Sequence, residues 1–284
     1  MNAEYLSSAK NPHIKQLLLL QQKSSERRRT GLFVVEGRRE LEHCIEVGFE
    51  VVELYVCPEL AGEDISQSFN SQSFNSQFSI SQSSISQSSI YHLPPSLYER
   101  IAYRGTTEGV VAVVRARHLT LSDLRLPECP LIVVLESVEK PGNLGAILRS
   151  ADAAGADAVC ICDPLTDLYN PNLIRASIGA AFTVPCVACS SEECIAFLQS
   201  RGIQILTAQL QDSHPYYDVD MRRPTAIVMG TESTGLTDQW RQAATAHIRI
   251  PMLGRLDSLN VSVSSAILLY EAVRQREPQN QQHP

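Results

Sequence analysis

The stretch Leu131–Val159, LIVVLESVEKPGNLGAILRSADAAGADAV, sets the expected fold class of the C-terminal half of this chain. An apolar run precedes a loop containing Pro, Gly and Asn, and an Ala-rich amphipathic segment follows. This order is typical of the strand, loop and helix that begin a nucleotide-binding α/β domain. Apolar residues at helical spacing predict the buried stripe of the helix: Leu144, Ile147, Leu148, Ala151 and Ala154.

The loop carries neither common phosphate-binding motif. From Gly142, a G-x-G-x-x-G motif requires glycine where the chain has Leu144 and Ile147, and no Walker G-K-[ST] sequence follows. A nucleotide-dependent oxidoreductase is therefore disfavoured. Two polar residues remain: Asn143 at the expected start of the helix, and Arg149 nearly two turns later, off the apolar stripe. An isolated Arg at such a position more often forms a surface ion pair.

The rest of the second half alternates between strands and helices. Expected strands lie at 131–136, 158–162, 182–188, 204–209, 226–230 and 247–252, and a long helix lies at 261–276. This pattern predicts a mostly parallel sheet with helices on both faces.

The first half reads as a smaller α/β unit over residues 1–117. Helices are expected at 11–31, 38–48 and 94–102, and strands at 32–37, 51–57 and 109–116. A polar, Pro-containing linker (118–130) would join the two domains, the second domain would span 131–276, and residues 277–284 would form a tail.

Residues 66–90 are five near-copies of a five-residue Ser/Gln-rich unit. Such a segment buries too little apolar surface to offset its ordering entropy, and we expect a flexible surface loop without a catalytic part. A small β-rich interaction patch is the less favoured alternative.

Composition favours a globular protein of one or two domains, with 284 residues, 44% of them hydrophobic. No apolar run approaches a membrane span and the N-terminus is polar, so a cytoplasmic location is expected.

The net charge of −7 argues against a general nucleic-acid binder. Basic residues nevertheless gather within residues 1–40, either as a solvated helix face or as a phosphate-binding patch. The patch would comprise Lys23, Arg27, Arg28, Arg29, Arg38 and Arg39.

Eight cysteines in a chain of this length do not indicate a disulfide scaffold. The sequence CVAC, Cys186–Cys189, has the spacing of zinc ligands. Because no second pair lies at a suitable separation and the histidines are scattered, the sequence predicts no metal site.

Two later segments favour a functional role for Asn143 and Arg149 over a purely structural one. Residues 227–236, IVMGTESTGL, are a strand followed by a Gly-flanked turn that contains Glu232. Residues 250–272 contain a strand end, a Gly loop, and then Ser258, Leu259 and Asn260 at the start of a helix. The Ser, Asn, Ser and Ser side chains crowded at this helix start exceed what helix capping requires. In an α/β sheet, strand-end loops are where a ligand is expected.

Together these three segments resemble the motifs of the SpoU–TrmH family of RNA ribose 2′-O-methyltransferases, of the SPOUT class. The order is N-x-x-x-x-x-R, then M-G-x-E-x-x-G-L, then I-P-M-x-G-x-x-x-S-L-N-V-S-V, within residues 131–275. The first half more weakly resembles that family's L30e-like substrate-binding domain. The resemblance implies a C-terminal trefoil knot, bound S-adenosylmethionine and a homodimer formed through the SPOUT domain. The Ser/Gln repeat is foreign to the family pattern.

The resemblance also implies roles for individual residues. The catalytic set would be Asn143, Arg149, Glu232, Ser258 and Asn260. The cofactor pocket would be lined by Thr207, Gly230, Ile250, Met252, Ser258 and Leu259. Lys140 departs from the acidic residue frequent before the Pro of the first motif. Arg175, in NPNLIRASIGA, would reach RNA or the partner's site.

Because a guanidinium stays charged under ordinary conditions, Arg149 is expected to stabilise charge rather than act as a base. The expected substrate is ribosomal RNA, with 23S rRNA first and transfer RNA as the alternative. A catalytically silent RNA-binding protein is a further hypothesis, against which the intact polar set speaks.

Overall fold

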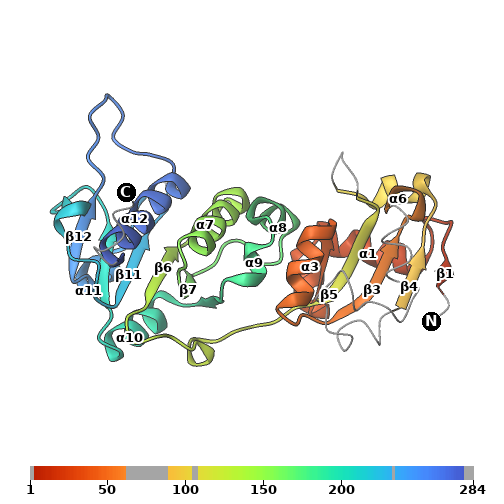
Figure 1. Cartoon of the computed structure of the whole chain (residues 1–284), viewed down its shortest axis with the longest axis horizontal. Coiled ribbons are helices and arrows are strands. Elements are labelled where there is room, and N and C mark those ends of the chain that lie inside the picture. The colour runs from red at the N-terminus through yellow and green to blue at the C-terminus, as the bar shows by residue number, and fades with distance from the viewer. Residues whose placement is uncertain (1–2, 62–88, 104–107, 232–233, 278–284) are drawn as a thin grey trace, which may run out of the picture. The chain divides into compact units, whose positions relative to one another are not determined.

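The computed structural model describes residues 3–61, 89–103, 108–231 and 234–277. The chain divides into two compact units (Figure 1). Unit 1 consists of residues 1–117 and 167–183, and unit 2 consists of residues 118–166 and 184–284. Most of the Ser/Gln repeat lies outside the described residues. Its last two residues belong to a strand, which differs from the expected loop.

Unit 1 is built on a five-stranded sheet in the order β1-β4-β3-β5-β2. The strands are β1 (Glu4–Tyr5), β2 (Leu32–Glu36), β3 (Val51–Val56), β4 (Ser89–His92) and β5 (Val110–Arg115). β5 pairs antiparallel with both β2 and β3, whereas β4 is parallel to β3 and β1. The helices are α1 (Pro12–Gln22), α2 (Ser24–Thr30), α3 (Arg38–Glu46), α4 (Pro58–Ala61), α6 (Pro95–Ile101), α8 (Pro171–Ser177) and α9 (Ala180–Thr183).

Alternating side chains give this sheet two buried faces. In β2, Phe33 and Val35 pack with α3, α8 and α9, whereas Val34 packs with α1 and α6. An irregular register between Val51 and Glu53 places Val51 and Leu54 on the same face despite their odd separation. A sheet covered on both faces explains the nearly unbroken apolar runs of its central strands.

Two further differences from the sequence expectations concern unit 1. The expected helix at 11–31 is two helices, because Lys23 adopts an extended backbone conformation between α1 and α2. Residues 167–183, expected in the second domain, pack instead with unit 1. Ile174 and Phe182 supply the cause, since both are buried in the core that contains Phe33.

Unit 2 contains a seven-stranded sheet in the order β10-β12-β9-β11-β6-β7-β8, in which all neighbours are parallel. The strands are β6 (Leu131–Glu136), β7 (Ala158–Cys162), β8 (Cys186–Cys189), β9 (Gln204–Ala208), β10 (His214–Pro215), β11 (Thr225–Met229) and β12 (Ala246–Arg249). From β6 the chain builds outward through β7 and β8, and it then returns to build on the other side. The boundary between β6 and β11 is therefore a topological switch point.

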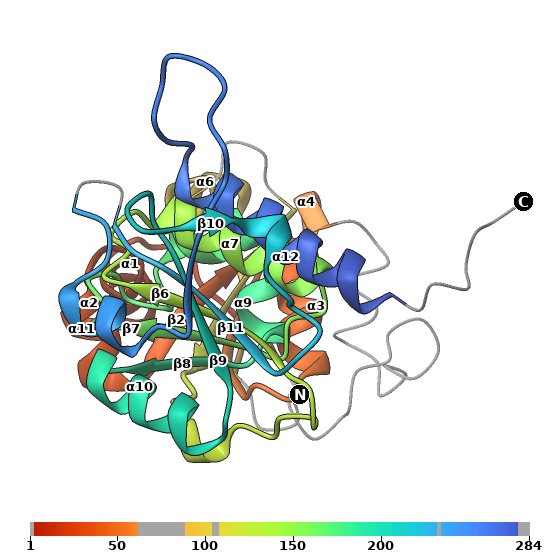
Figure 2. The same ribbon diagram turned by 90° about the vertical axis from the view of Figure 1, so that its left-hand side faces the viewer.

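Helices cover both faces of this sheet, as expected (Figure 2). α10 (Ser191–Ser200) and α11 (Asp238–Ala243) cover one face, where Trp240 is fully buried. α7 (Pro141–Ala153) and α12 (Val261–Arg276) pack against each other, and α12 also packs on β11. All six residues of β6 are buried. The trefoil knot stays a prediction.

Several boundaries in unit 2 differ from the expectations. The expected strand at 247–252 ends earlier, at Arg249. The expected strand at 182–188 begins later, at Cys186, because Phe182 and Thr183 end α9. The expected linker, 118–130, is part of unit 2. It forms a short 3-10 helix, Leu121–Asp123, and Leu124 is buried in the same core as Trp240.

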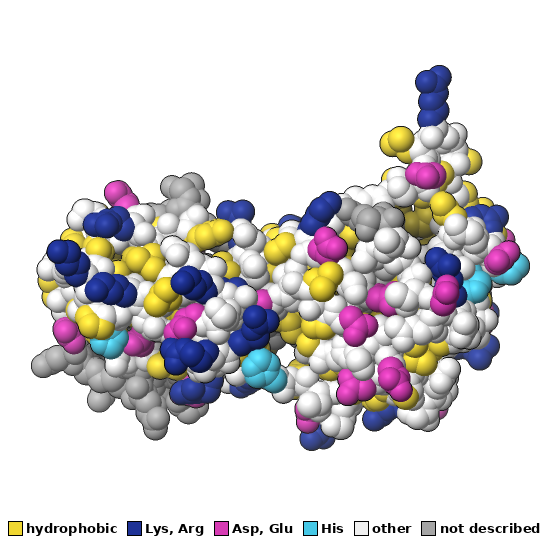
Figure 3. Space-filling model, turned by 180° about the vertical axis from the view of Figure 1, so that it is seen from behind, with side chains coloured by type: hydrophobic (Ala, Val, Ile, Leu, Met, Phe, Trp, Pro, Cys, Tyr) yellow, Lys and Arg dark blue, Asp and Glu magenta, His cyan; other side chains and the backbone are white. Residues whose placement is uncertain are grey.

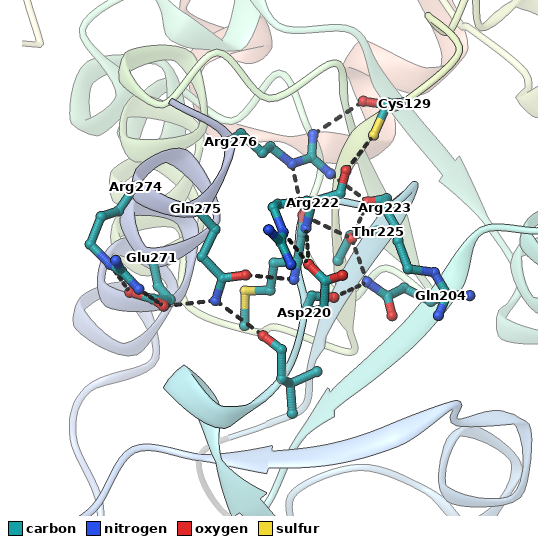
Figure 4. A network of polar contacts seen from close by, with 12 residues as sticks. Cys129, Gln204, Asp220, Arg222, Arg223, Thr225, Glu271, Arg274, Gln275 and Arg276 are labelled. Carbon is teal, nitrogen blue, oxygen red and sulfur yellow. Dashed lines mark hydrogen bonds and ion pairs between the residues drawn. The ribbon is translucent and has the colours of Figure 1, made fainter. Parts of the chain in front are cut away.

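Polar contacts join the C-terminal end of α12 to the sheet (Figure 4). The Arg276 guanidinium donates to the carbonyls of Met221, Cys129, Pro130 and Arg223 at 2.8–3.1 Å. These carbonyls lie just before β6 and β11, so one side chain joins the starts of both strands to the helix.

A neighbouring group reinforces this junction. Gln275 accepts a hydrogen bond from the Met221 amide at 2.8 Å and donates to Glu271. Hydrogen bonds from Arg274 and Gln275 lower the pKa of Glu271. The last turn of α12 is therefore held by several polar contacts as well as by packing.

Replacing Arg276 with alanine should destabilise unit 2. Four carbonyls lose a charged donor, and we expect a loss of roughly 2 kcal/mol in the free energy of unfolding. Urea titration followed by circular dichroism measures this loss. Arg222→Ala is the control, because Arg222 is exposed and pairs with Asp220 at the surface, where ion pairs contribute little. Equal midpoints for the two variants would contradict the anchoring role.

Among the helices of the described residues, none combines the length and the hydropathy that a membrane span requires.

Candidate active site at the strand ends of unit 2

A cavity of about 110 Å3 lies at the switch point between β6 and β11. It is formed by the loop after β6, the start of α7, the loop after β11 and the start of α12. Its lining residues are Val138, Glu139, Lys140, Asn143, Gly230, Thr231 and Val261. Segments from all three sequence motifs therefore meet at the carboxyl ends of adjacent parallel strands, where α/β proteins bind ligands.

Asn143 and Asn260 are in direct contact at this cavity. The Asn260 Nδ2 donates to the Asn143 Oδ1 at 3.2 Å, across 117 residues of sequence. The Oδ1 of Asn260 also accepts from the amide and the hydroxyl of Ser262, so Asn260 is the N-cap of α12. The structure thus brings these two residues of the predicted catalytic set into contact.

The variant Asn260→Ala should therefore show two effects. Loss of the N-cap should lower stability by about 1 kcal/mol, and loss of the contact with Asn143 should reduce any activity of the site more than stability alone explains. Asn260→Ser separates the two effects, because Ser can still cap the helix but is too short to reach Asn143. Thermal unfolding and an activity assay on the same samples measure both. Full activity in both variants would exclude a role for this contact.

Gly230 follows β11 at a point where no side chain fits. A Cβ atom built on Gly230 would lie 2.4 Å from the carbonyl carbon and oxygen of Gly235 and 2.6 Å from the Leu236 nitrogen. The backbone closes tightly here, since the Gly235 amide donates to the Thr231 carbonyl at 3.1 Å. Gly230 is therefore required for the shape of the loop that borders the cavity.

Glu136 is a site residue that the sequence reasoning missed. It ends β6 and is 2% exposed. Its carboxylate accepts from the hydroxyl of Thr237 at 2.6 Å and from the amide of Thr237 at 2.9 Å. Glu136 thereby fixes the far end of the loop that begins at Gly230. A carboxylate at the end of an otherwise apolar strand was the available signal.

A second, more open hollow of about 530 Å3 lies on the loop between β12 and α12. The loop itself is the projecting blue loop in Figures 1 and 2. Ile250, Met252, Ser258 and Leu259, four of the predicted cofactor residues, line it. Its volume lies within the range of about 300–1,000 Å3 usual for small-molecule sites.

The remaining predicted residues of unit 2 lie in different settings. Thr207 is fully buried in β9, where it is paired with residues of both β11 and β12. Its hydroxyl is hydrogen-bonded to the Nδ1 of His247 at 2.6 Å, and it lines neither of the two hollows. Arg149 is exposed on α7, as the sequence predicted from its place off the apolar stripe. Glu232 lies outside the described residues.

Most of the predicted RNA-binding residues are exposed on unit 1, where Lys and Arg side chains spread over the face seen in Figure 3. Arg29 and Arg38 also pair with Glu26 and Glu42. The exposed members of the set are Lys23, Arg28, Arg29, Arg38, Arg39 and Arg175.

Arg27 departs from the predicted set. It is 5% exposed and bonds to the Asp167 carboxylate at 2.6 Å and to the carbonyls of Leu20 and Gln21. It joins α1, α2 and the segment before α8, which is a structural role. Arg175 lies over the Tyr103 ring and lines a small cavity with Gln21 and Glu36, all within unit 1.

A parallel sheet with a cavity at its switch point, together with a second α/β unit in the same chain, defines a two-domain α/β protein with a candidate ligand site. Residues 130–270 match the SpoU rRNA Methylase family, and residues 11–112 match the MRM3-like substrate binding domain. The chain belongs to the SpoU rRNA methylase family.

Individual relatives agree with this assignment. The chain is 38% identical to the 23S rRNA (guanosine-2′-O-)-methyltransferase RlmB of Vibrio parahaemolyticus, over 62% of this chain and 73% of the relative. It is 26% identical to the 23S rRNA (guanosine(2553)-2′-O)-methyltransferase RlmP of Bacillus subtilis, over 93% and 97% of the two chains. A crystal structure of an AdoMet-bound rRNA methyltransferase from Sinorhizobium meliloti is similar with a TM-score of 0.83, at 26% identity, covering 97% of this chain and 99% of the other.

Proposed function

We propose that this protein transfers a methyl group from S-adenosylmethionine to a ribose 2′-hydroxyl of 23S rRNA. The observation that carries the proposal is the meeting of Asn143, Gly230 and Asn260 around one strand-end site, with residues from all three family motifs. The proposal is also supported by the names of the relatives RlmB and RlmP, which are 23S rRNA 2′-O-methyltransferases.

The residues present fit S-adenosylmethionine. The hollow on the loop after β12 combines apolar side chains, Ile250, Met252 and Leu259, with the hydroxyl of Ser258. Such a lining suits a ligand that has a flat adenine and a polar ribose. The loop around Gly230 brings main-chain groups close to the neighbouring cavity. When bound, the cofactor supplies the electrophilic methyl group.

On the substrate side, Arg149 would hold an RNA phosphate or the developing 2′-alkoxide by electrostatic attraction. A substrate phosphate oxygen would take the proton, because a guanidinium that stays charged is a poor base. Asn143 and Asn260, already bonded to each other, would orient Arg149 and the ribose. We assign Ser258 to the same polar set. Glu232 would fix the motif loops.

Unit 1 would bind the rRNA through its exposed basic side chains. Phosphate contacts from Lys and Arg position a nucleic acid without reading its sequence. The residues that we assign to this role are Lys23, Arg28, Arg29, Arg38, Arg39 and Arg175. Local positive charge makes the net charge of −7 compatible with RNA binding.

The active assembly would be a homodimer formed through unit 2. Leu253 is 99% exposed and Leu256 is 78% exposed on the projecting loop (Figure 2). Large apolar side chains exposed together are typical of surfaces that bind another protein. Sedimentation of the purified protein measures its oligomeric state.

The proposed function is tested by mapping 2′-O-methylation over total RNA from cells with and without the gene. We expect the loss of methylation at one position of 23S rRNA, restored by a plasmid copy. Loss at a transfer RNA position instead would overturn the assignment of the substrate. No change at any position, with S-adenosylmethionine binding absent in calorimetry, would overturn the enzymatic assignment.

A further inference from the structure

Three thiols from β7, β8 and α10 converge at one end of the β7–β8 edge of unit 2. The Sγ atoms of Cys162, Cys189 and Cys194 all lie within 4.8 Å of one another. The Cys162 and Cys189 sulfurs are 3.9 Å apart. Cys162 and Cys194 are fully buried, whereas Cys189 is half-buried. None of the three borders the cavity at the switch point or the hollow on the projecting loop.

Secondary structure explains the convergence. Cys162 and Cys189 are paired residues of the parallel strands β7 and β8, so their side chains leave the same face of the sheet. α10 begins two residues after Cys189, and its first turn is fixed by the capping box of Ser190 and Glu193. That turn places Cys194 over the strand ends, in the core that also contains Cys162.

The same geometry explains why the spacing of CVAC is misleading. In a strand, residues three apart point to opposite faces, so Cys186 and Cys189 cannot hold one ion together. The partners of Cys189 come instead from β7 and α10, 27 residues before it and a few residues after it. Sequence spacing alone does not reveal this combination.

We propose that Cys162, Cys189 and Cys194 bind one thiophilic divalent cation, for which zinc is the best candidate. Sulfur atoms at about 2.3 Å from a tetrahedral zinc ion lie about 3.8 Å from each other. The Cys162 and Cys189 sulfurs, 3.9 Å apart, are close to this separation. Thiolate ligands select zinc or copper(I) over hard cations.

A disulfide is the competing use of these thiols. A disulfide needs Cβ atoms roughly 3.5–4.5 Å apart and sulfurs about 2 Å apart. Neighbouring strands lie about 4.7–4.9 Å apart, so paired residues of β7 and β8 would have to move together. A metal ion bridges the observed sulfur separation without such movement. The half-buried Cys189 leaves room for water as a fourth ligand.

The ion would connect β7, β8 and α10 beneath the Ser191 network. The Ser191 hydroxyl donates to Asp163 at 2.6 Å and accepts from the Trp240 indole at 3.0 Å. The site would thus stabilise the edge of the sheet and the start of α10. This role is independent of the proposed methyl transfer.

The test uses the full chain purified under reducing conditions, incubated with Zn2+ and desalted. Elemental mass spectrometry should find one zinc per chain. Replacement by Co2+ should give the intense thiolate-to-metal charge-transfer absorption of sulfur ligation. Cys189→Ser and Cys194→Ser should lose both signals. Cys186→Ser is the matched control, because Cys186 lies on the same strand but faces the other way, and it should retain both.

Cys189→Ser keeps the test decisive if Cys194→Ser does not fold, because Cys189 is only half-buried. A trace of zinc far below one per chain in the unaltered protein would overturn the proposal. Equal zinc in Cys189→Ser and Cys186→Ser would also overturn it. A Cys162–Cys189 disulfide in protein purified without reductant, with no zinc bound, would assign the cluster to redox chemistry instead.

Discussion

Replacing Arg149 with alanine should lower kcat for methyl transfer by about 10²–10³-fold, the usual loss when one donor that stabilises transition-state charge is removed. Arg149 lies exposed on α7, outside the apolar stripe that packs into unit 2. The fold should therefore tolerate the change. Affinity for S-adenosylmethionine should stay within about twofold, because we assign the cofactor to the later loops. Single-turnover methylation with labelled cofactor measures the rate.

The control for this variant is Arg241→Ala. Arg241 is a partly exposed arginine of the same unit that pairs with Asp238 on α11, and its loss should leave the rate unchanged. Arg149→Lys tests the chemistry further, because Lys keeps the charge but lacks the planar fork of donors. A near-normal rate for Arg149→Ala, with cofactor binding intact, would remove Arg149 from the reaction.

The sequence predicted the elements of unit 2 well because its strands are uniformly apolar and its helices are amphipathic. The expected helix at 261–276 coincides with α12. The apolar stripe predicted for α7 is buried at Leu144, Ile147, Leu148 and Ala151. Local pattern determines such elements, since side-chain periodicity alone decides which face is buried.

The sequence was less informative wherever a residue acts through distant partners. Arg27 resembled its exposed neighbours Arg28 and Arg29, but a carboxylate 140 residues later and two carbonyls bind it inside unit 1. The sequence spacing grouped Cys189 with Cys186 as possible zinc ligands, whereas the thiols near Cys189 are those of Cys162 on β7 and Cys194 on α10. Charge and spacing describe a side chain, whereas burial and tertiary partners decide its role.

The contact between Asn143 and Asn260 was predicted only in part. Both residues belong to family motifs and could be marked from the sequence, but only the fold shows that the Asn260 amide donates to Asn143. Glu136 had no motif to mark it, and its importance comes from the Thr237 groups that it binds. The cavity is thus assembled from residues that the sequence marked and from supports that it did not mark.

The variant Gly230→Ala tests the loop that borders this cavity, and it should abolish activity. Its Cβ would lie 2.4 Å from the backbone of Gly235 and 2.6 Å from that of Leu236. All three of these atoms belong to the backbone of one peptide unit, so no flexible side chain can give way and the loop itself must shift. We expect at least a tenfold weaker affinity for S-adenosylmethionine, and a stability loss of about 1–3 kcal/mol. Calorimetric titration and thermal unfolding measure the two effects.

Gly142→Ala provides the matched control for this test. Gly142 lies in the first turn of α7, close to the same cavity, yet a Cβ there would meet no atom within 4 Å. Alanine also favours a helix over glycine, so this variant should be at least as stable as the unaltered protein. Loss of cofactor binding in Gly230→Ala alone would tie the tight loop to the cofactor. Unchanged binding in Gly230→Ala would place the cofactor away from the loop after β11 and leave the hollow at Ile250, Met252 and Leu259 as its site.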